Sequence, residues 1–279
     1  MAKVKQASLF PGFGLKNVKG KILYADCLEC MKSIEDNSID LVVTSPPYVM
    51  RRKDTYGGIT PEEYPDWIYQ VGEEIFRILK PTGNFVLNIN DTVEKGLRTT
   101  YVYEAVIKLS KLFRWTDTFI WAKANPFPTG TKRRLKDGFE YCYWFTKTKD
   151  YKFFPDAMLV PSTSKYLESE KRRKNKGEHR TSNGSGMDMS KRYISDMVRP
   201  ANVITLPTDT TNHVHPAAFP LSLPTFFIKL MSEPGDVVFD PFMGGGTTLL
   251  AARQEGRNYI GCDIVKEYVD ATKERLEII

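Results

Sequence analysis

The sequence lacks any apolar run long enough to span a lipid bilayer, and its first residues, Met1-Ala2-Lys3-Val4-Lys5-Gln6, lack the apolar stretch of a signal peptide. We therefore expect no membrane association and a cytoplasmic location. Cysteine is scarce, with 4 residues in 279. Cys27 and Cys30 have zinc-like spacing but no second pair near them. We interpret the cysteines as reduced core thiols, with these two on one helix, and expect no metal site.

Strand and helix patterns instead alternate along most of the chain, which is typical of an α/β fold with a mainly parallel sheet. The chain is long enough for one large domain with an insertion. Strands are expected at Lys21–Tyr24, Leu41–Val43, Asn84–Asn88 and Phe119–Trp121, and a strand at Phe139–Phe145 should form a hairpin with the one before it. Helices are expected at Pro61–Leu79, Tyr101–Phe113 and Lys266–Leu276.

A polar, charged stretch from residue 150 to 198 breaks this alternation with prolines and a Ser/Asn/Gly run. We therefore divide the chain into an N-terminal arm (1–18), a first half of the main domain (19–149), an insertion (150–198) and a second half (199–279). The two halves would complete one parallel sheet if the C-terminal helix leads back toward the Lys21 strand, because chain termini commonly lie near each other at a domain surface.

The segment Ser45-Pro46-Pro47-Tyr48 follows the apolar strand Ile39–Val43 and Thr44. In open α/β sheets, ligands bind at this end of the strands. The two prolines fix φ and lack N–H donors, so the segment is stiff and its carbonyls are free to accept hydrogen bonds. Ser45 adds an acceptor and Tyr48 a flat ring. The turn would suit a planar group bearing an exocyclic amine, although an ordinary Pro-rich turn with a packing tyrosine is the structural alternative.

A second motif has the order strand, glycine loop, helix. The strand Asp236–Asp240 is followed by Pro241-Phe242-Met243-Gly244-Gly245-Gly246-Thr247-Thr248 and an apolar helical run. Glycines allow close approach of the backbone to a ligand. The next strand ends in Asp263, 19 residues after Gly244 (263 − 244), and an acid about 20 residues on suits a ribose hydroxyl pair. The motif favours a nucleoside-containing cofactor over a tight β-α turn.

Together the two motifs resemble the amino-group DNA methyltransferases that use S-adenosylmethionine. In that family a D-P-F-x-G-x-G-T-T loop cradles the methionine part of the cofactor, and an S/D/N-P-P-Y/F turn holds the target amine. The order here, with the catalytic motif first, resembles the permuted beta group. Three further segments resemble family motifs, namely Lys21–Leu28, the W-x-K-x-N-P segment Trp121–Pro126 and the H-P-x-x-F-P segment within His213–Pro220. Gly245 is a departure, because a serine is common there. The similarity covers most of the chain except about 150–198.

The resemblance implies a Rossmann-like class I methyltransferase fold, with a seven-stranded sheet that has one antiparallel strand. It implies the catalytic residues Ser45, Pro46, Pro47 and Tyr48. It implies the cofactor-binding residues Asp26, Asp240, Pro241, Phe242, Gly244, Gly246, Thr247, Asp263, His215 and Phe219, of which the two last are the weaker candidates.

Basic residues exceed acidic ones by six, as the net charge of +6 shows. Two clusters concentrate this charge, one at Lys132, Arg133 and Arg134 and one at Lys171, Arg172, Arg173 and Lys174. Release of counterions from phosphates could supply affinity for double-stranded DNA there, whereas the structural alternative is a pair of solvated loops. We interpret the insertion as the region that recognises the DNA sequence, with a disordered loop without a role as its alternative.

Within the family, serine at the first turn position is usual for cytosine-N4 enzymes and aspartate for adenine-N6 enzymes. Ser45 therefore predicts a site-specific methyltransferase that acts on N4 of a flipped-out cytosine. The resemblance further implies a restriction-modification system, in which a cognate restriction endonuclease would be the partner, although no residue of the chain indicates one. The alternatives are an adenine-N6 enzyme, an RNA or protein-amide methyltransferase, and a DNA-binding protein without catalysis. The recognition sequence, and whether the protein is a monomer or a homodimer, stay open.

Overall fold

The computed structural model of the protein describes residues 18–49, 58–127, 133–162, 172, 196–208 and 219–277. The chain divides into two compact units. The first consists of Met1–Phe153 with Asn202–Ile279, and the second of Phe154–Ala201. The described part of the second unit contains a short 3-10 helix, η1 (Pro155–Met158), and the antiparallel pair β8 (Val160–Pro161) and β9 (Met197–Val198).

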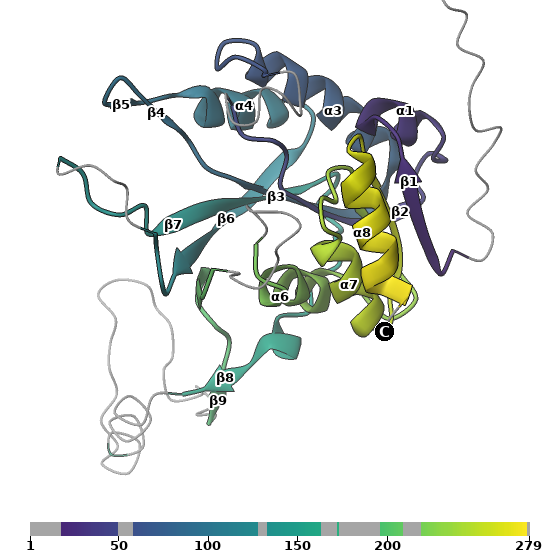
Figure 1. The fold of residues 1–279 in the computed structure, drawn as a ribbon. Helices are drawn as coiled ribbons and strands as arrows, with labels where there is room; N and C mark the ends of the chain where they lie inside the picture. The colour runs from purple at the N-terminus through teal and green to yellow at the C-terminus, as the bar shows by residue number, and fades with distance from the viewer. Residues whose placement is uncertain are drawn as a thin grey trace, which may run out of the picture. The chain divides into compact units, whose positions relative to one another are not determined.

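The first unit is built on a mixed sheet, which confirms the predicted α/β class (Figure 1). Its strand order across the described residues is β1 (Gly20–Tyr24), β12 (Asn258–Asp263), β11 (Val237–Asp240), β2 (Ile39–Thr44), β3 (Leu79–Ile89), β7 (Phe139–Thr146), β6 (Arg114–Lys123) and β10 (Val203–Leu206).

Only β7 in this sheet runs antiparallel to its neighbours, and it forms the predicted hairpin with β6. The expectation of seven strands was wrong, because the sheet of the described residues has eight. The extra strand is β10, which pairs in parallel with β6 through Val203 and Ile120. It follows the second unit directly and extends the sheet beyond the hairpin.

The first and last strands of the chain lie side by side in this sheet. β1 pairs in parallel with β12, and Tyr24 is the partner of Asp263. The last helix, α8 (Lys266–Glu277), packs against β1. The two halves of the chain therefore complete one sheet, as predicted, and bring the ends of β1, β12, β11 and β2 to one edge.

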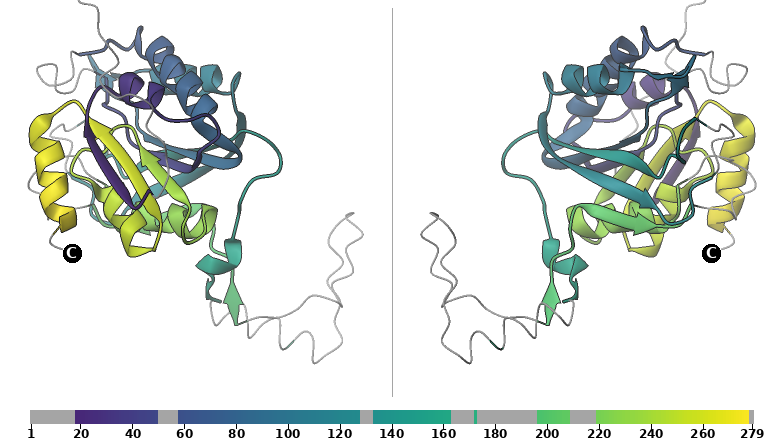
Figure 2. Two further views of the ribbon diagram at one scale, coloured as in Figure 1. Left: turned by 90° about the vertical axis from the view of Figure 1, so that its right-hand side faces the viewer. Right: turned by 90° about the vertical axis from the view of Figure 1, so that its left-hand side faces the viewer.

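Helices cover both faces of the sheet (Figures 1 and 2). One face carries α1 (Cys27–Lys32), α3 (Tyr64–Ile78) and α4 (Tyr101–Leu109), and the other carries α6 (Ser222–Met231), α7 (Thr247–Gln254) and α8. α3 begins three residues later than predicted, at Tyr64 with Pro65 in its first turn. Its buried residues recur at helical spacing and face the core. None of the helices in the described residues is long and apolar enough to cross a bilayer.

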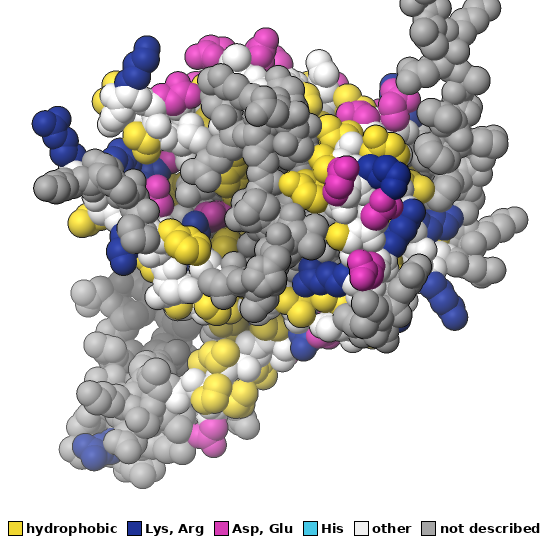
Figure 3. Space-filling view, viewed as in Figure 1, with side chains coloured by type: hydrophobic (Ala, Val, Ile, Leu, Met, Phe, Trp, Pro, Cys, Tyr) yellow, Lys and Arg dark blue, Asp and Glu magenta, His cyan; other side chains and the backbone are white. Residues whose placement is uncertain are grey.

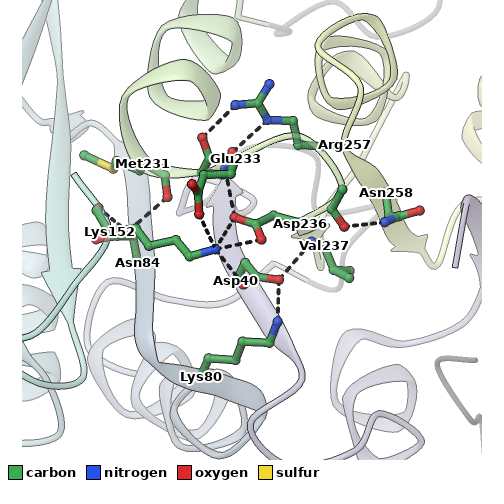
Figure 4. A network of polar contacts seen from close by, with 12 residues as sticks. Asp40, Lys80, Asn84, Lys152, Met231, Glu233, Asp236, Val237, Arg257 and Asn258 are labelled. Atoms are coloured by element: carbon green, nitrogen blue, oxygen red, sulfur yellow. Dashed lines mark hydrogen bonds and ion pairs between the residues drawn. The ribbon is translucent and has the colours of Figure 1, made fainter. Parts of the chain in front are cut away.

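Ion pairs hold the edge of the sheet where β2 and β11 begin (Figure 4). Asp40 is 2 % exposed and pairs with Lys80 at 2.8 Å and with Lys152 at 3.5 Å. Lys152 also contacts Glu233 at 3.2 Å and Asp236 at 2.6 Å. Because Asp40 lies at the start of β2, this network is at the opposite end of the strand from the Ser45 turn.

Candidate active site

The Ser45 turn and the glycine loop follow neighbouring strands. β2 ends at Thr44 and β11 at Asp240, and the two strands pair in parallel through Val42 and Phe239. The Thr44 hydroxyl donates to Asp240 Oδ1 at 2.6 Å. The structure therefore brings together the two motifs that the sequence singled out, and a direct hydrogen bond links them.

Asp240 is buried at this link, with 2 % of its surface exposed. Its Oδ1 also accepts from the Phe242 N–H at 3.0 Å. Burial raises the pKa of Asp240 from 3.8 to about 6, although hydrogen bonds from Thr44, Thr248 and Phe242 act in the opposite direction. The carboxyl group thus joins the end of β2 to the start of the glycine loop. Its contact with a cofactor stays a prediction.

The glycine loop depends on backbone conformations that favour glycine. Gly244 has φ +48° and Gly246 has φ +73°. A Cβ atom added to Gly246 would lie 2.4 Å from Thr272 Cγ2, so the loop passes α8 without room for a side chain. Gly246 is also the residue from which α7 starts.

Two side chains of α8 hold this loop by its carbonyl groups. The Thr272 hydroxyl donates to Gly244 O at 2.9 Å, and Arg275 Nη1 donates to Gly245 O at 2.7 Å. Arg275 also reaches the Thr247 hydroxyl at 3.2 Å. Sequence reasoning missed both residues. The available signal was their spacing of three, which places them on one face of the predicted last helix.

Asp263 also holds the glycine loop, by accepting a hydrogen bond from its backbone. It lies at the end of β12 and is 4 % exposed. Its Oδ2 accepts from the Gly244 N–H at 3.0 Å and its Oδ1 from the Val265 N–H at 2.9 Å. The carboxylate therefore lies at the end of β12 in direct contact with the glycine loop. The ribose contact itself stays a prediction.

Asp26 lies at the neighbouring strand end and caps α1. Its side chain accepts from the Leu28 N–H at 2.9 Å and the Glu29 N–H at 3.4 Å, as a helix N-cap does. The adjacent Ala25 N–H donates to Asp263 O at 3.1 Å. Asp26, Asp263 and Asp240 therefore stand at the ends of three adjacent strands, at the edge where the sequence places the cofactor.

Tyr48 is held by a residue that sequence reasoning missed. Its hydroxyl donates to Glu140 Oε2 at 2.7 Å, and Lys123 Nζ lies 2.8 Å from Glu140 Oε1. Burial and the nearby Glu140 carboxylate raise the pKa of Tyr48 well above its ordinary value, so the phenol stays protonated. Lys123 belongs to the segment Trp121–Pro126, which resembles the family's W-x-K-x-N-P motif. Glu140 lies in an aromatic-rich strand and belongs to none of the motifs found in the sequence.

The remaining predicted residues are placed as follows. Phe242 packs its ring on Trp67, with centroids 5.5 Å apart. Pro241, Thr247 and Phe219 are buried. His215 lies outside the described residues, as do Lys132, Lys171, Arg173 and Lys174 of the basic clusters. Of those clusters, Arg133 and Arg172 are exposed and Arg134 is partly exposed.

Lys and Arg side chains do not gather in one patch on the face shown in Figure 3, where they are interspersed with Asp and Glu. The predicted DNA contacts of the basic clusters therefore stay a prediction.

The cysteines are buried and free. Cys27 and Cys30 both lie on α1, as predicted. Burial raises the pKa of the Cys27 thiol to about 12, so this thiol is neutral. Within the described residues, no group of three or more His, Cys, Asp or Glu side chains is arranged to hold a metal ion.

In comparisons with known proteins, the chain is similar to DNA methyltransferases. Residues 39–274 match the N6/N4 methylase family model, described as DNA methylase. The chain is 31 % identical to the type II methyltransferase M.PvuII of Proteus hauseri, over 92 % of this chain and 83 % of the relative.

Among solved structures, the cytosine-N4-specific PvuII DNA methyltransferase superposes with a TM-score of 0.71 at 28 % identity, covering 92 % of this chain and 86 % of that one. The putative DNA modification methylase TTHA0409 of Thermus thermophilus, solved as a complex with S-adenosyl-L-methionine, gives a TM-score of 0.63 at 26 % identity, with 93 % of each chain covered.

Proposed function

The chain belongs to the N6/N4 DNA methylase family, and we propose that it methylates the exocyclic N4 of cytosine in double-stranded DNA. It is an S-adenosylmethionine-dependent DNA methyltransferase. The family name covers both target bases, so the base is the open point. The observation that carries the choice of cytosine is Ser45 at the first position of the turn, where adenine enzymes usually have aspartate. The cytosine-N4-specific PvuII enzyme among the similar structures supports the same choice.

The residues at the strand ends fit the cofactor. Gly244 and Gly246 have positive φ angles, and the absence of side chains there lets the loop's backbone approach a ligand closely. Asp263 and Asp26 offer carboxylate oxygens for hydroxyl and amine donors, and Phe242 offers an apolar surface. The bound cofactor supplies a methyl group on a sulfonium, which is electrophilic. The chain's own task is to orient the acceptor amine toward that methyl group.

An exocyclic amine is a poor nucleophile because its lone pair is delocalised into the base. Ser45 Oγ and the Pro46 carbonyl can accept hydrogen bonds from the two N–H groups. These bonds would favour a pyramidal nitrogen, whose lone pair is localised and points toward the methyl donor. The Tyr48 ring would stack on the base, which must first leave the duplex. The rigid Pro46-Pro47 segment and the Thr44–Asp240 bond keep the turn aligned with the glycine loop. Positioning then supplies much of the rate acceleration, without a covalent enzyme intermediate.

The proposal also covers the biological context, the DNA contacts and the alternative target base. The protein would act within a restriction-modification system, since the M.PvuII relative is a type II methyltransferase. We assign recognition of the DNA sequence to the insertion at 150–198, and phosphate contacts to the clusters containing Arg133, Arg134 and Arg172. The second candidate is adenine N6, because a hydroxyl can accept from either amine. RNA and protein amides rank below both.

The test is methyl transfer from labelled S-adenosylmethionine to unmethylated genomic DNA, with the product nucleosides resolved by mass spectrometry. We expect label in N4-methylcytosine. Label in N6-methyladenine would retain the fold and the amine chemistry but refute the inference from Ser45. Label in RNA or protein alone would refute DNA as the substrate.

A further inference from the structure

Lys123 and Glu140 form an ion pair beside the catalytic turn. Lys123 is the last residue of β6 and Glu140 the second of β7, and the strand register places Trp121 opposite Glu140. Since alternate residues of a strand share a face, Trp121, Lys123 and Glu140 project from the same side. Lys123 Nζ lies 5.4 Å from the Trp121 ring centroid. The Lys123 and Glu140 side chains are only 16 % and 12 % exposed.

A pair this buried is weak evidence for stability, because the desolvation of two charges offsets most of their attraction. The pair does, however, hold a third group. One carboxylate oxygen of Glu140 pairs with the Lys123 ammonium, and the other accepts a hydrogen bond from the Tyr48 hydroxyl at 2.7 Å. Tyr48 and Glu140 are 92 positions apart in the chain, so this contact ties the β2 turn to the β6–β7 hairpin.

The donors and acceptors in this chain of contacts permit one direction. A lysine ammonium only donates and its paired carboxylate only accepts, so the Tyr48 hydroxyl must donate its proton to Glu140. The Tyr48 hydroxyl is therefore fixed as a donor toward Glu140, which holds the phenol end of the ring in one place.

We propose that Glu140, paired with Lys123, is a positioning residue that fixes the Tyr48 ring for the target base. The inference rests on the proposed function and deepens it, because it names what holds the ring on which the base would stack. It applies equally to cytosine N4 and adenine N6.

The test is a double-mutant cycle on the rate of a single methyl-transfer turnover at saturating cofactor and DNA. In Glu140→Gln, the one amide oxygen can serve Lys123 or Tyr48 but not both, so the direction of the chain is lost. We expect transfer to slow by about tenfold to 100-fold, as loss of one charge-assisted hydrogen bond allows, while the cofactor dissociation constant stays within about twofold. Tyr48→Phe should slow transfer through the same contact.

The double variant decides between positioning and an independent role. Since Glu140 acts through the Tyr48 hydroxyl, Tyr48→Phe/Glu140→Gln should be no slower than the slower single variant. Multiplied effects, or a wild-type rate in Glu140→Gln, would overturn the proposal. If Glu140→Gln fails to fold, Lys123→Met tests the same claim, and an unchanged transfer rate in that variant would overturn it.

A matched control is available at the other end of β2. Asp40 is also a buried carboxylate paired with a lysine at 2.8 Å, so Asp40→Asn disturbs a similar pair away from the turn. Asp40→Asn should lower thermal stability but leave the single-turnover rate unchanged. The wild-type product tests the proposed function, and the ratio of variant to wild-type rate tests the role of Glu140. The two claims can therefore fail separately.

Discussion

Replacing Gly246 with alanine should weaken cofactor binding, and the structure gives the size of the effect. Gly246 has φ +73°, a conformation that costs a residue with a Cβ about 1–2 kcal/mol. The added Cβ would lie 2.4 Å from Thr272 Cγ2, and overpacking of this kind costs about 1–3 kcal/mol more. If the loop moves to relieve about 2–5 kcal/mol of strain and must return to bind, the affinity should fall at least about 30-fold.

Gly256→Ala is the matched control, because Gly256 has φ +74° and nothing lies within 4 Å of its added Cβ. In both variants alanine must adopt a positive φ, which destabilises the folded state. The difference between their free energies of unfolding therefore measures the clash between the added Cβ and Thr272. Gly246→Ala/Thr272→Ser, which removes the Cγ2 methyl, should recover part of the affinity for S-adenosylmethionine measured by calorimetry. Wild-type affinity in Gly246→Ala would refute the claim that the conformation of this loop controls cofactor binding.

Three further predictions concern charged side chains. The Asp240 carboxyl has a pKa of about 6 in the folded protein, compared with its ordinary value of 3.8. The folded state therefore binds more protons than the unfolded state in this range. As the pH rises from about 4 to about 6, the free energy of unfolding should fall by about 3 kcal/mol through this group. Urea titrations of Asp240→Asn should lack that decline, and equal pH profiles would refute the burial argument. Asp263→Ala leaves the Gly244 N–H without its acceptor, so calorimetry should show weaker cofactor binding; unchanged affinity would contradict this role. Lys152→Met should cost about 1–3 kcal/mol in urea unfolding by leaving Asp40 and Asp236 with fewer partners, and unchanged stability would show that the network is not needed.

The sequence predicted the elements that carry the two motifs because strand, turn and glycine signals are local. The ends of β2 and β11 meet because these strands are parallel neighbours, and no local signal in the sequence specifies that pairing. The pairing of the short strand β10 was not predictable, because four residues leave its partner unspecified.

Glu140, Thr272 and Arg275 were missed for a different reason. Each acts through a contact between elements far apart in the chain, such as the 92 positions between Tyr48 and Glu140. Their side chains carry no motif of their own, so only the register of β6 and β7 and the packing of α8 on the glycine loop reveal them.

The central claim is that the Ser45 turn performs the chemistry while the glycine loop holds the cofactor. The most direct test is the single-turnover rate of Ser45→Ala at saturating S-adenosylmethionine, with the cofactor dissociation constant measured on the same sample. We predict that N4-methylcytosine formation falls by about 100-fold or more, as loss of a hydrogen bond that acts in the transition state can cause, while the dissociation constant is unchanged. Normal turnover, or loss of cofactor binding as the cause of the defect, would contradict the claim.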